Sequence, residues 1–555
     1  MKRILVTLMS MLLLFGGVEA SAQSLLQKAA EAAKKEAAKK AAELKEAAKN
    51  AANQAVEGAK NTATQTAESA VGTANQAVEG AKSAVNGAVN QAAGAAADAA
   101  GAAGVATVAV SGAAIPTSSL SFSSAKPSGV VYYVSAEGSN RADGKSATTP
   151  LKDIQKALDA IHDAGQDGAT ICVAEGNYLG YMDAGYIEIK NFITLQGGWN
   201  ADFTERNPFK YITRMQPGPE QAGTSGSKGL ITVSGLDDID YKVGGTLTID
   251  GLMLDYGFET AYFPYDPTDP KTGSPEGVDT GRMVDDPAKQ VQHQLFHSDA
   301  AIAGNVVITN CLFLNSPYFG IQFNTRCGEV EICNNVIVSN RYGGVRVDGW
   351  DKEGYRSHVN FHHNSVGFSW CRDKIMEDMG YGYEFMNKVS GDVHHNIFFC
   401  NNYAAIARTH ALSGPDAVIE AKKVTNVYDN LFLMNAADIQ LPSAGGGKWT
   451  NVMVKQFDDI SEKTIPKIDG NKNIASDDPF LSFIWEPYLK GFANLKVLDS
   501  SSSFDANSAA NLYRQAHGMN MQGTEIHRVS MYGNRYRFDE AMKLFGAKAG
   551  YGAQR

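Results

Sequence analysis

Residues 360–366 read NFHHNSV and residues 392–398 read DVHHNIF, so a His-His-Asn triplet recurs between apolar neighbours after 32 residues. An asparagine follows an apolar anchor by three positions in five successive windows, and a polar residue stands five positions further on. This series indicates internal repeats that stack as coils of a solenoid. The anchors are Val307, Ile332, Phe361, Val393 and Val427; the asparagines are Asn310, Asn335, Asn364, Asn396 and Asn430; the later residues are Asn315, Asn340, Ser369, Asn401 and Asn435.

The repeat predicts where the doubled histidines lie. In stacked parallel strands one position recurs about every 4.8 Å, so the asparagines are expected to form a hydrogen-bonded ladder inside a turn. Imidazoles beside this ladder can act as hydrogen-bond donors and acceptors within the turn, which favours a structural role for the doubled histidines. A soft divalent metal or a catalytic site is the alternative, with Asp429 as an acidic third member. The predicted columns are Ile308, Cys333, His362, His394 and Tyr428, and Thr309, Asn334, His363, His395 and Asp429.

A second strand is predicted in each coil, because apolar and polar residues alternate in FGIQFNTR (319–326), GGVRVDGW (343–350) and GYGYEFMN (380–387). Its apolar residues are expected to face the interior. Arg346 and Glu384 would then face each other across coils, which is most often a surface ladder contact. The predicted outward columns are Gln322, Arg346, Glu384, Ala407 and Gln440, and Asn324, Asp348, Met386 and Thr409.

Residues 130–178 predict a strand, an amphipathic helix over 151–162 and a second strand. This stretch, from VVYYVSAEGSN to VAEGNY, resembles the N-terminal cap and first coil of secreted right-handed parallel β-helix proteins, including the pectate lyase relatives. The resemblance implies an all-β protein, a right-handed parallel β-helix with an N-terminal cap helix. We therefore expect the β-helix over residues 130–480 and a C-terminal cap and tail over 481–555.

The first part of the chain predicts three further segments. Residues 1–22 have a basic head, an apolar run and small residues at the end, which is typical of a cleaved secretory signal. Residues 23–113 are Ala-rich. The sequence ANQAVEGAK begins at residue 52 and again at residue 74, and this shift of 22 residues equals two eleven-residue helical periods. This arm is expected to be a weakly packed helix or coiled coil that self-associates or contacts a surface, or else a flexible spacer. Residues 114–129 are expected to be a linker.

Composition limits the possible partners and locations. The net charge of −10 disfavours nucleic acid as a partner. No segment after the signal is long and apolar enough to predict a transmembrane helix, so a secreted, periplasmic or cell-surface location is expected. The six cysteines follow no metal-binding spacing, and some are expected to be buried thiols. Long polar excursions at 256–303 and 370–381 are expected to wall a groove.

The resemblance to pectate lyase relatives also implies a polysaccharide lyase or hydrolase. The sequence VDGWD at 347–351 is similar to the Asp-rich DDGWD of family 9 pectate lyases but has one acidic residue fewer. In such lyases a basic residue removes a proton while Ca2+ neutralises the uronate. The resemblance implies Arg346, Glu384 and Lys388 as catalytic candidates; Gln322, Asn324, Asp348, Trp350 and Tyr381 as substrate-binding candidates; and Asp348 and Asp351 as Ca2+ ligands.

These observations predict an exported β-helix protein that binds an acidic polysaccharide or cell-surface glycan in a groove along the solenoid, with cleavage as an open extension. The alternative is a non-catalytic cell-surface or matrix protein with a structural or adhesive role. A β-helix by itself does not choose between the two, because the fold hosts both.

Overall fold

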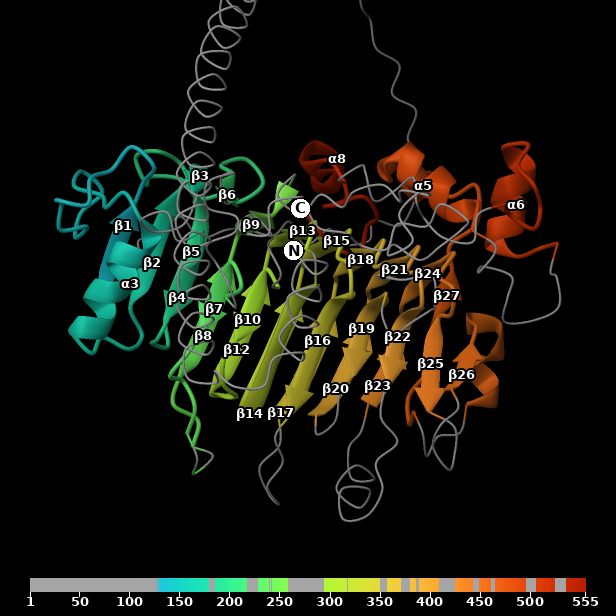
Figure 1. The fold of residues 1–555 in the computed structure, drawn as a ribbon, viewed down its shortest axis with the longest axis horizontal. Helices are drawn as coiled ribbons and strands as arrows, with labels where there is room; N and C mark the ends of the chain where they lie inside the picture. Colours follow the sequence, from blue (N-terminus) through green and yellow to red (C-terminus); the bar gives the residue numbers. More distant parts are fainter. Residues whose placement is uncertain are drawn as a thin grey trace, which may run out of the picture. The chain divides into compact units, whose positions relative to one another are not determined.

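The computed structural model divides the chain into two units, Met1–Ala113 and Ala114–Arg555, and all the residues it describes belong to the second (Figure 1). The predictions for the signal, the Ala-rich arm and most of the linker therefore lie outside the described residues. The described residues are 127, 129–178, 185–216, 228–238, 240, 242–257, 294–316, 318–349, 357–370, 380–385, 389–408, 425–442, 449–460, 465–495, 506–524 and 536–555.

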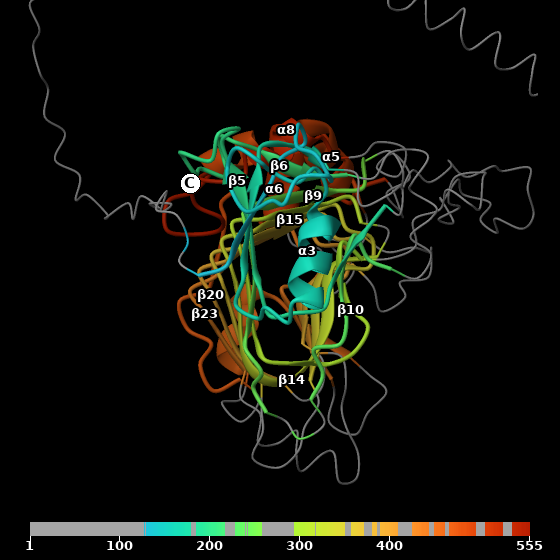
Figure 2. The same cartoon turned by 90° about the vertical axis from the view of Figure 1, so that its left-hand side faces the viewer.

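The second unit is a parallel β-helix with three sheets, which confirms the predicted fold (Figures 1 and 2). Sheet A contains β1 (Val131–Val134), β2 (Thr170–Ala174), β5 (Thr194–Trp199), β8 (Thr246–Asp250), β12 (Asn305–Thr309), the second half of β14 (Phe319–Cys333), β17 (Ser357–His362), β20 (Val389–His394) and β23 (Thr425–Tyr428).

Sheet B contains β3 (Gly176–Tyr178), β6 (Thr213–Met215), β9 (Leu252–Asp255), β13 (Leu312–Leu314), β15 (Val336–Val338), β18 (Ser365–Gly367), β21 (Ile397–Phe399), β24 (Leu431–Leu433) and β27 (Lys472–Asn473). Sheet C contains β4 (Ile187–Ile189), β7 (Ile231–Val233), β10 (Phe296–Ser298), β11 (Ile302–Ala303), the first half of β14, β16 (Gly343–Gly349), β19 (Tyr381–Phe385), β22 (Ala404–Arg408) and β25 (Ile439–Pro442). An antiparallel strand, β26 (Trp449–Val452), pairs with β25 at one end.

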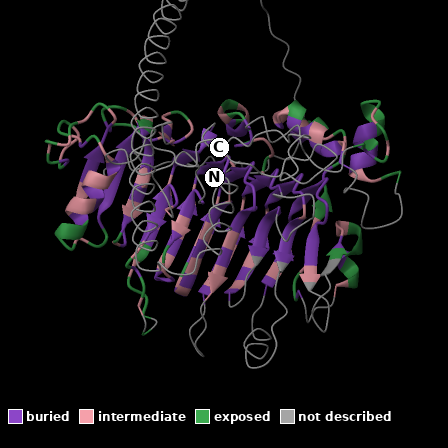
Figure 3. Cartoon of the chain, viewed as in Figure 1, coloured by how far each residue is buried: buried purple, intermediate pink, exposed green. Residues whose placement is uncertain are grey.

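Inward-facing apolar residues hold successive coils together. In sheet A, Ile332 pairs with Phe361 in the next coil, and Phe361 pairs with Val393. All three are fully buried, whereas the residues that alternate with them in β17 and β20 are half-buried (Figure 3). Phe361 also stacks on Tyr383 of sheet C across the interior, with ring centroids 4.5 Å apart. The alternating sequence pattern thus builds a closed apolar interior along the axis.

Helix α3 (Ile154–Asp163) lies across the interior at the N-terminal end, as expected of a cap (Figure 2). It begins three residues later than predicted. Its buried residues Ile154, Ala157, Leu158 and Ile161 follow helical spacing and belong to the main core. The helix therefore shields the apolar side chains of the first coils from water.

The C-terminal residues pack along the flank of the solenoid. Helices α5 (Glu486–Ala493), α6 (Ala509–Ala516) and α8 (Phe538–Met542) share an apolar cluster with outward residues of sheet B, such as Leu314 and Phe399 (Figure 1). The central strands of sheet B are therefore buried on both faces, namely β9, β13, β15, β18, β21 and β24. A cap placed only over the end of the solenoid would not make these contacts. No helix among the described residues is long and apolar enough to span a membrane.

The predicted asparagine ladder is present, with one correction. Asn335, Asn364, Asn396 and Asn430 are joined by side-chain amide bonds of 3.0–3.1 Å, and Asn471 extends the row. Asn310 is not a member, because Thr309 pairs with Cys333 and the first coil is therefore displaced by one residue from the predicted alignment. Cys311 takes its place, and its N–H donates to Asn335 Oδ1 at 2.9 Å.

The same displacement corrects the other columns in the first coil. Thr309, and not Ile308, lies in the column of Cys333; Asn310, and not Thr309, lies in the column of Asn334; and Ser316, and not Asn315, lies in the column of Asn340. Members of the turn column have left-handed backbone, with φ of 51–58°. Asn, Asp and His tolerate this conformation better than most residues, which explains the residue types found there. The column is Asn310, Asn334, His363, His395 and Asp429.

Candidate functional site

The outer face of sheet C carries the polar column that the sequence predicted. Arg346 of β16 pairs with Gln322 of β14 on one side and Glu384 of β19 on the other. The register continues from Glu384 through Ala407 to Gln440. Asn324 and Asp348 pair in the neighbouring column. We call the row Gln322, Arg346, Glu384 and Gln440, together with Asn324 and Asp348, the sheet C polar row.

Arg346 is the charged centre of this row. Its Nε lies 3.3 Å from Asp348 Oδ2 and 3.9 Å from Glu384 Oε2. The Arg346 and Asp348 side chains are 28% and 25% exposed, whereas that of Glu384 is 5% exposed. The guanidinium also lies over the Phe319 ring at 5.8 Å. Two carboxylates and a ring thus fix the orientation of a partly exposed cation.

Amide side chains extend the row in both directions. Gln322 accepts a hydrogen bond from Gln294 at one end. At the other end Gln440 accepts from the Tyr381 hydroxyl at 3.3 Å and donates to Asn451 at 3.1 Å. Gln440 is 1% exposed, so this member of the row is a buried support and not a surface for a ligand.

Tyr381 differs from its predicted role as a substrate-binding surface. Its side chain is fully buried in an apolar cluster with Ala404, Ala407 and Ala437. It therefore supports Gln440 through its hydroxyl and presents no ring face to a ligand. Trp350, Asp351 and Lys388 lie outside the described residues, so the roles predicted for them stay predictions.

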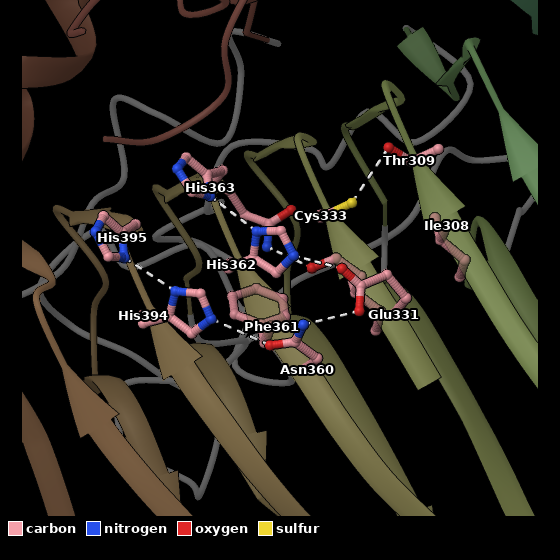
Figure 4. Close-up of polar contacts among 12 residues, drawn as sticks. Ile308, Thr309, Glu331, Cys333, Asn360, Phe361, His362, His363, His394 and His395 are labelled. Atoms are coloured by element: carbon pink, nitrogen blue, oxygen red, sulfur yellow. Dashed lines mark hydrogen bonds and ion pairs between the residues drawn. The ribbon is translucent and has the colours of Figure 1, made fainter. Parts of the chain in front are cut away.

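The doubled histidines lie at the edge of sheet A, where strands β17 and β20 enter the turn toward sheet B (Figure 4). His362 stacks on His394 with ring centroids 5.0 Å apart, and His363 stacks on His395 at 5.1 Å. Tyr428 continues the first stack at 4.9 Å. Each pair of neighbouring histidines is joined between Nδ1 atoms, at 2.8 Å for His362 and His363. The columns predicted from sequence are therefore real stacks over these coils.

A polar network lies on the same face, two residues before the stack in each strand (Figure 4). His362 Nε2 contacts Glu331 Oε1, and Asn360 Nδ2 donates to Glu331 Oε2 at 2.9 Å. Asn360 Oδ1 lies 3.2 Å from His394 Nε2. Glu331 thereby receives two contacts from β17, and Asn360 links it to His394 of β20.

Burial controls the protonation of this face. It lowers the pKa of His363 and of His394 to about 4, with help from neighbouring imidazoles, so both rings are neutral at pH 7. Burial raises the pKa of the Cys333 thiol to about 12. Burial opposes ionisation of Glu331 as well, but hydrogen bonds from His362 and Asn360 outweigh it and lower the pKa of that carboxyl.

Three donor groups of different chemistry converge here. One ligand atom each of Glu331, Cys333 and His362 lies within 4.8 Å of the other two. The sequence interpretation placed Cys333 in the column of His362 but named Asp429 as the acidic member. Glu331 was missed because the alignment followed the columns nearest the asparagines. The signal that could have found it is its position two residues before Cys333, on the same face of one strand.

The other described cysteines are buried. Cys172, Cys311 and Cys327 are free thiols, which confirms the expectation that some cysteines are buried thiols, and Cys400 is buried as well.

Comparison with known proteins adds little. No family model and no curated protein matches the chain. The crystal structure of pectate lyase Pel9A is similar over 59% of this chain and 80% of that chain, with 12% identity and a TM-score of 0.25. The complex of XylC with xylose is similar over 62% and 83%, with 10% identity and a TM-score of 0.17. Likeness at this level carries no argument about the site, so function must be argued from the geometry above.

Proposed function

We propose that the chain is an exported protein that binds an acidic polysaccharide along the sheet C polar row. The observation that carries the proposal is the register of this row. Amide, guanidinium and carboxylate groups recur at the coil spacing of about 4.8 Å, and they are continuous from Gln322 to Glu384. A linear array of planar donors and acceptors suits an extended chain of sugar hydroxyl and carboxylate groups.

Arg346 is the group best placed to meet a uronate carboxylate. Among the described residues both of its carboxylate contacts use Nε, which leaves Nη1 and Nη2 for a ligand. A guanidinium binds a carboxylate through two parallel N–H donors. Asp348 and Glu384 would hold this fork in position, because ion pairs on both sides restrict rotation of the Arg346 side chain.

The geometry supports binding by Arg346 more than removal of a proton. A guanidinium is not deprotonated in proteins, and Arg346 Nε already contacts two carboxylates, so this side chain suits binding better than general-base catalysis. Ca2+ prefers six to eight oxygen ligands. Of the two predicted ligands only Asp348 is described, and it already contacts Arg346, so the described part of the row does not fit a Ca2+ site. The predicted signal at residues 1–22 supports a glycan outside the cytoplasm as the partner.

The proposal is tested by measuring binding of the full chain to polygalacturonate, alginate and a neutral xylan, by isothermal titration calorimetry. Arg346→Gln should weaken binding of the acidic polymers by about tenfold or more, equivalent to about 1.4 kcal/mol. Lys210→Gln is the matched control, because Lys210 is also paired with a carboxylate, that of Glu205 at 3.3 Å. Equal binding by the two variants, or no binding of any acidic polymer by the parent protein, would refute the proposal.

A further inference from the structure

We propose that Glu331, Cys333 and His362 form a binding site for one Zn2+-class divalent cation on the outer face of sheet A. We call these three residues the sheet A donor triad. The proposal is independent of the sheet C polar row, which lies on a different sheet.

The backbone positions the sheet A donor triad before any ligand arrives. Glu331 and Cys333 are two residues apart on β14, so their side chains leave the same face of the strand. His362 pairs directly with Cys333 in the next coil. Strand β14 is paired with β12 and β17, and β17 is paired with β14 and β20, so the three Cα positions are held rigidly and little conformational entropy is lost when a metal binds.

The distances suit a tetrahedral ion. The three ligand atoms lie within 4.8 Å of one another. Around Zn2+, with bonds of about 2.0–2.3 Å, neighbouring donors lie about 3–4 Å apart. Small side-chain rotations would close this difference. Three protein donors leave the fourth position to water.

The donor types select the metal. A thiolate and an imidazole together favour Zn2+ and other soft or borderline ions, whereas Ca2+ and Mg2+ prefer oxygen. On binding, the Cys333 thiol forms an S–metal bond and gives its proton to solvent, so no oxidant or reductant is required.

Surrounding residues orient two of the donors. His362 Nδ1 contacts His363 Nδ1 at 2.8 Å, which turns Nε2 toward Glu331. Asn360 holds Glu331 Oε2 at 2.9 Å, which leaves Oε1 on the side of His362. Supporting contacts of this kind fix ring and carboxylate orientation in metal sites. The stack of His362 on His394 further restricts the ring.

The test uses the full chain, which has no Cys or His in residues 1–113. Protein stripped with a chelator is dialysed against Zn2+, and the metal is counted by mass spectrometry. Co2+ is then added in place of Zn2+, because a thiolate-to-Co2+ charge-transfer band reports a bond to sulfur. Cys333→Ser and His362→Asn are compared with His358→Asn, a control on the same strand as His362 that contacts Asp392 at 2.9 Å.

We expect one Zn2+ per chain in the parent protein and in the control. Cys333→Ser should lose the charge-transfer band, and both triad variants should bind Zn2+ at least tenfold more weakly while keeping the parent circular dichroism spectrum. The proposal is overturned if the parent protein retains less than half an equivalent of Zn2+, if the band survives in Cys333→Ser, or if the triad variants bind like the control. Since binding of polysaccharide is measured separately, either proposal can fail alone.

Discussion

Replacement of Asn364 by alanine should destabilise the β-helix far more than a nearby surface substitution. Asn364 is fully buried in the ladder. Its Oδ1 accepts from the N–H and the side chain of Asn335, both at 3.0 Å. Its Nδ2 donates to the Ile332 carbonyl at 2.8 Å and to Asn396 Oδ1 at 3.1 Å. Alanine removes all four bonds and admits no water in their place.

The magnitude follows from the groups left behind. The Asn335 N–H and the Ile332 carbonyl each lose their side-chain partner in a buried turn. A buried polar group without a partner costs about 1–3 kcal/mol, so two predict a loss of about 4 kcal/mol in the free energy of unfolding. Asn360→Ala is the matched control. Its side chain is half-buried, water can replace its bonds to Glu331 and His394, and we expect a loss of less than about 1 kcal/mol.

Urea unfolding followed by circular dichroism measures both variants under the same conditions. The comparison requires that the unfolding free energy of the two variants depends on urea concentration with nearly the same slope, because a repeat protein can lose two-state behaviour. If Asn364→Ala and Asn360→Ala differ by less than about 1 kcal/mol, the ladder contributes no more than a surface contact and the reasoning is refuted.

Two further predictions concern sheet C. Burial raises the pKa of Asp438 from its ordinary 3.8 to about 6, so the folded protein binds a proton that the unfolded chain has released between these values. The free energy of unfolding should therefore fall as pH rises from about 4 to about 6, by up to about 1.4 kcal/mol per pH unit; urea titrations of Asp438→Asn should lack this slope, and equal slopes in both proteins would contradict the assignment. A methyl group at Gly382 would lie 2.5 Å from the Ala405 carbonyl oxygen of the next coil. Gly382→Ala should therefore lower the unfolding free energy by about 2 kcal/mol in the same assay, and an unchanged urea midpoint would show that the coils can separate to make room.

The fold and most of the register could be predicted from the sequence because a β-helix repeats its side-chain columns. From Ile332 onward each coil has one asparagine at the ladder position, so the alignment is unambiguous. In the preceding coil the asparagine, Asn310, occupies the left-handed position that Asn334 occupies in the next coil, and the ladder position holds Cys311 instead of an asparagine. Two adjacent positions that both accept asparagine allow a shift of one residue, and the prediction took the wrong one.

The sites could be predicted only in part. Alternation in the second strand placed Arg346 next to Glu384 correctly, since each side chain must face either the core or solvent. Burial of Tyr381 depends on Ala407 and Ala437 from later coils, which alternation in one strand does not reveal. The covering of sheet B was missed for a similar reason, because its strands have three residues in most coils and are too short to show two apolar faces.

The contacts of the last residues have a consequence for how the chain acquires its structure. Gln554 bonds to Asn334, Ala553 to Ser365, and Tyr536 to Asn315, across about two hundred residues of sequence. In a simple solenoid each coil depends on its neighbours alone, and the ends can fray independently. Here the tail bridges the middle coils, so we expect them to melt together. During synthesis the same arrangement leaves the apolar outside of sheet B uncovered until residues 486–555 have been added and have folded, and exposed apolar surface of this kind is what chaperones bind.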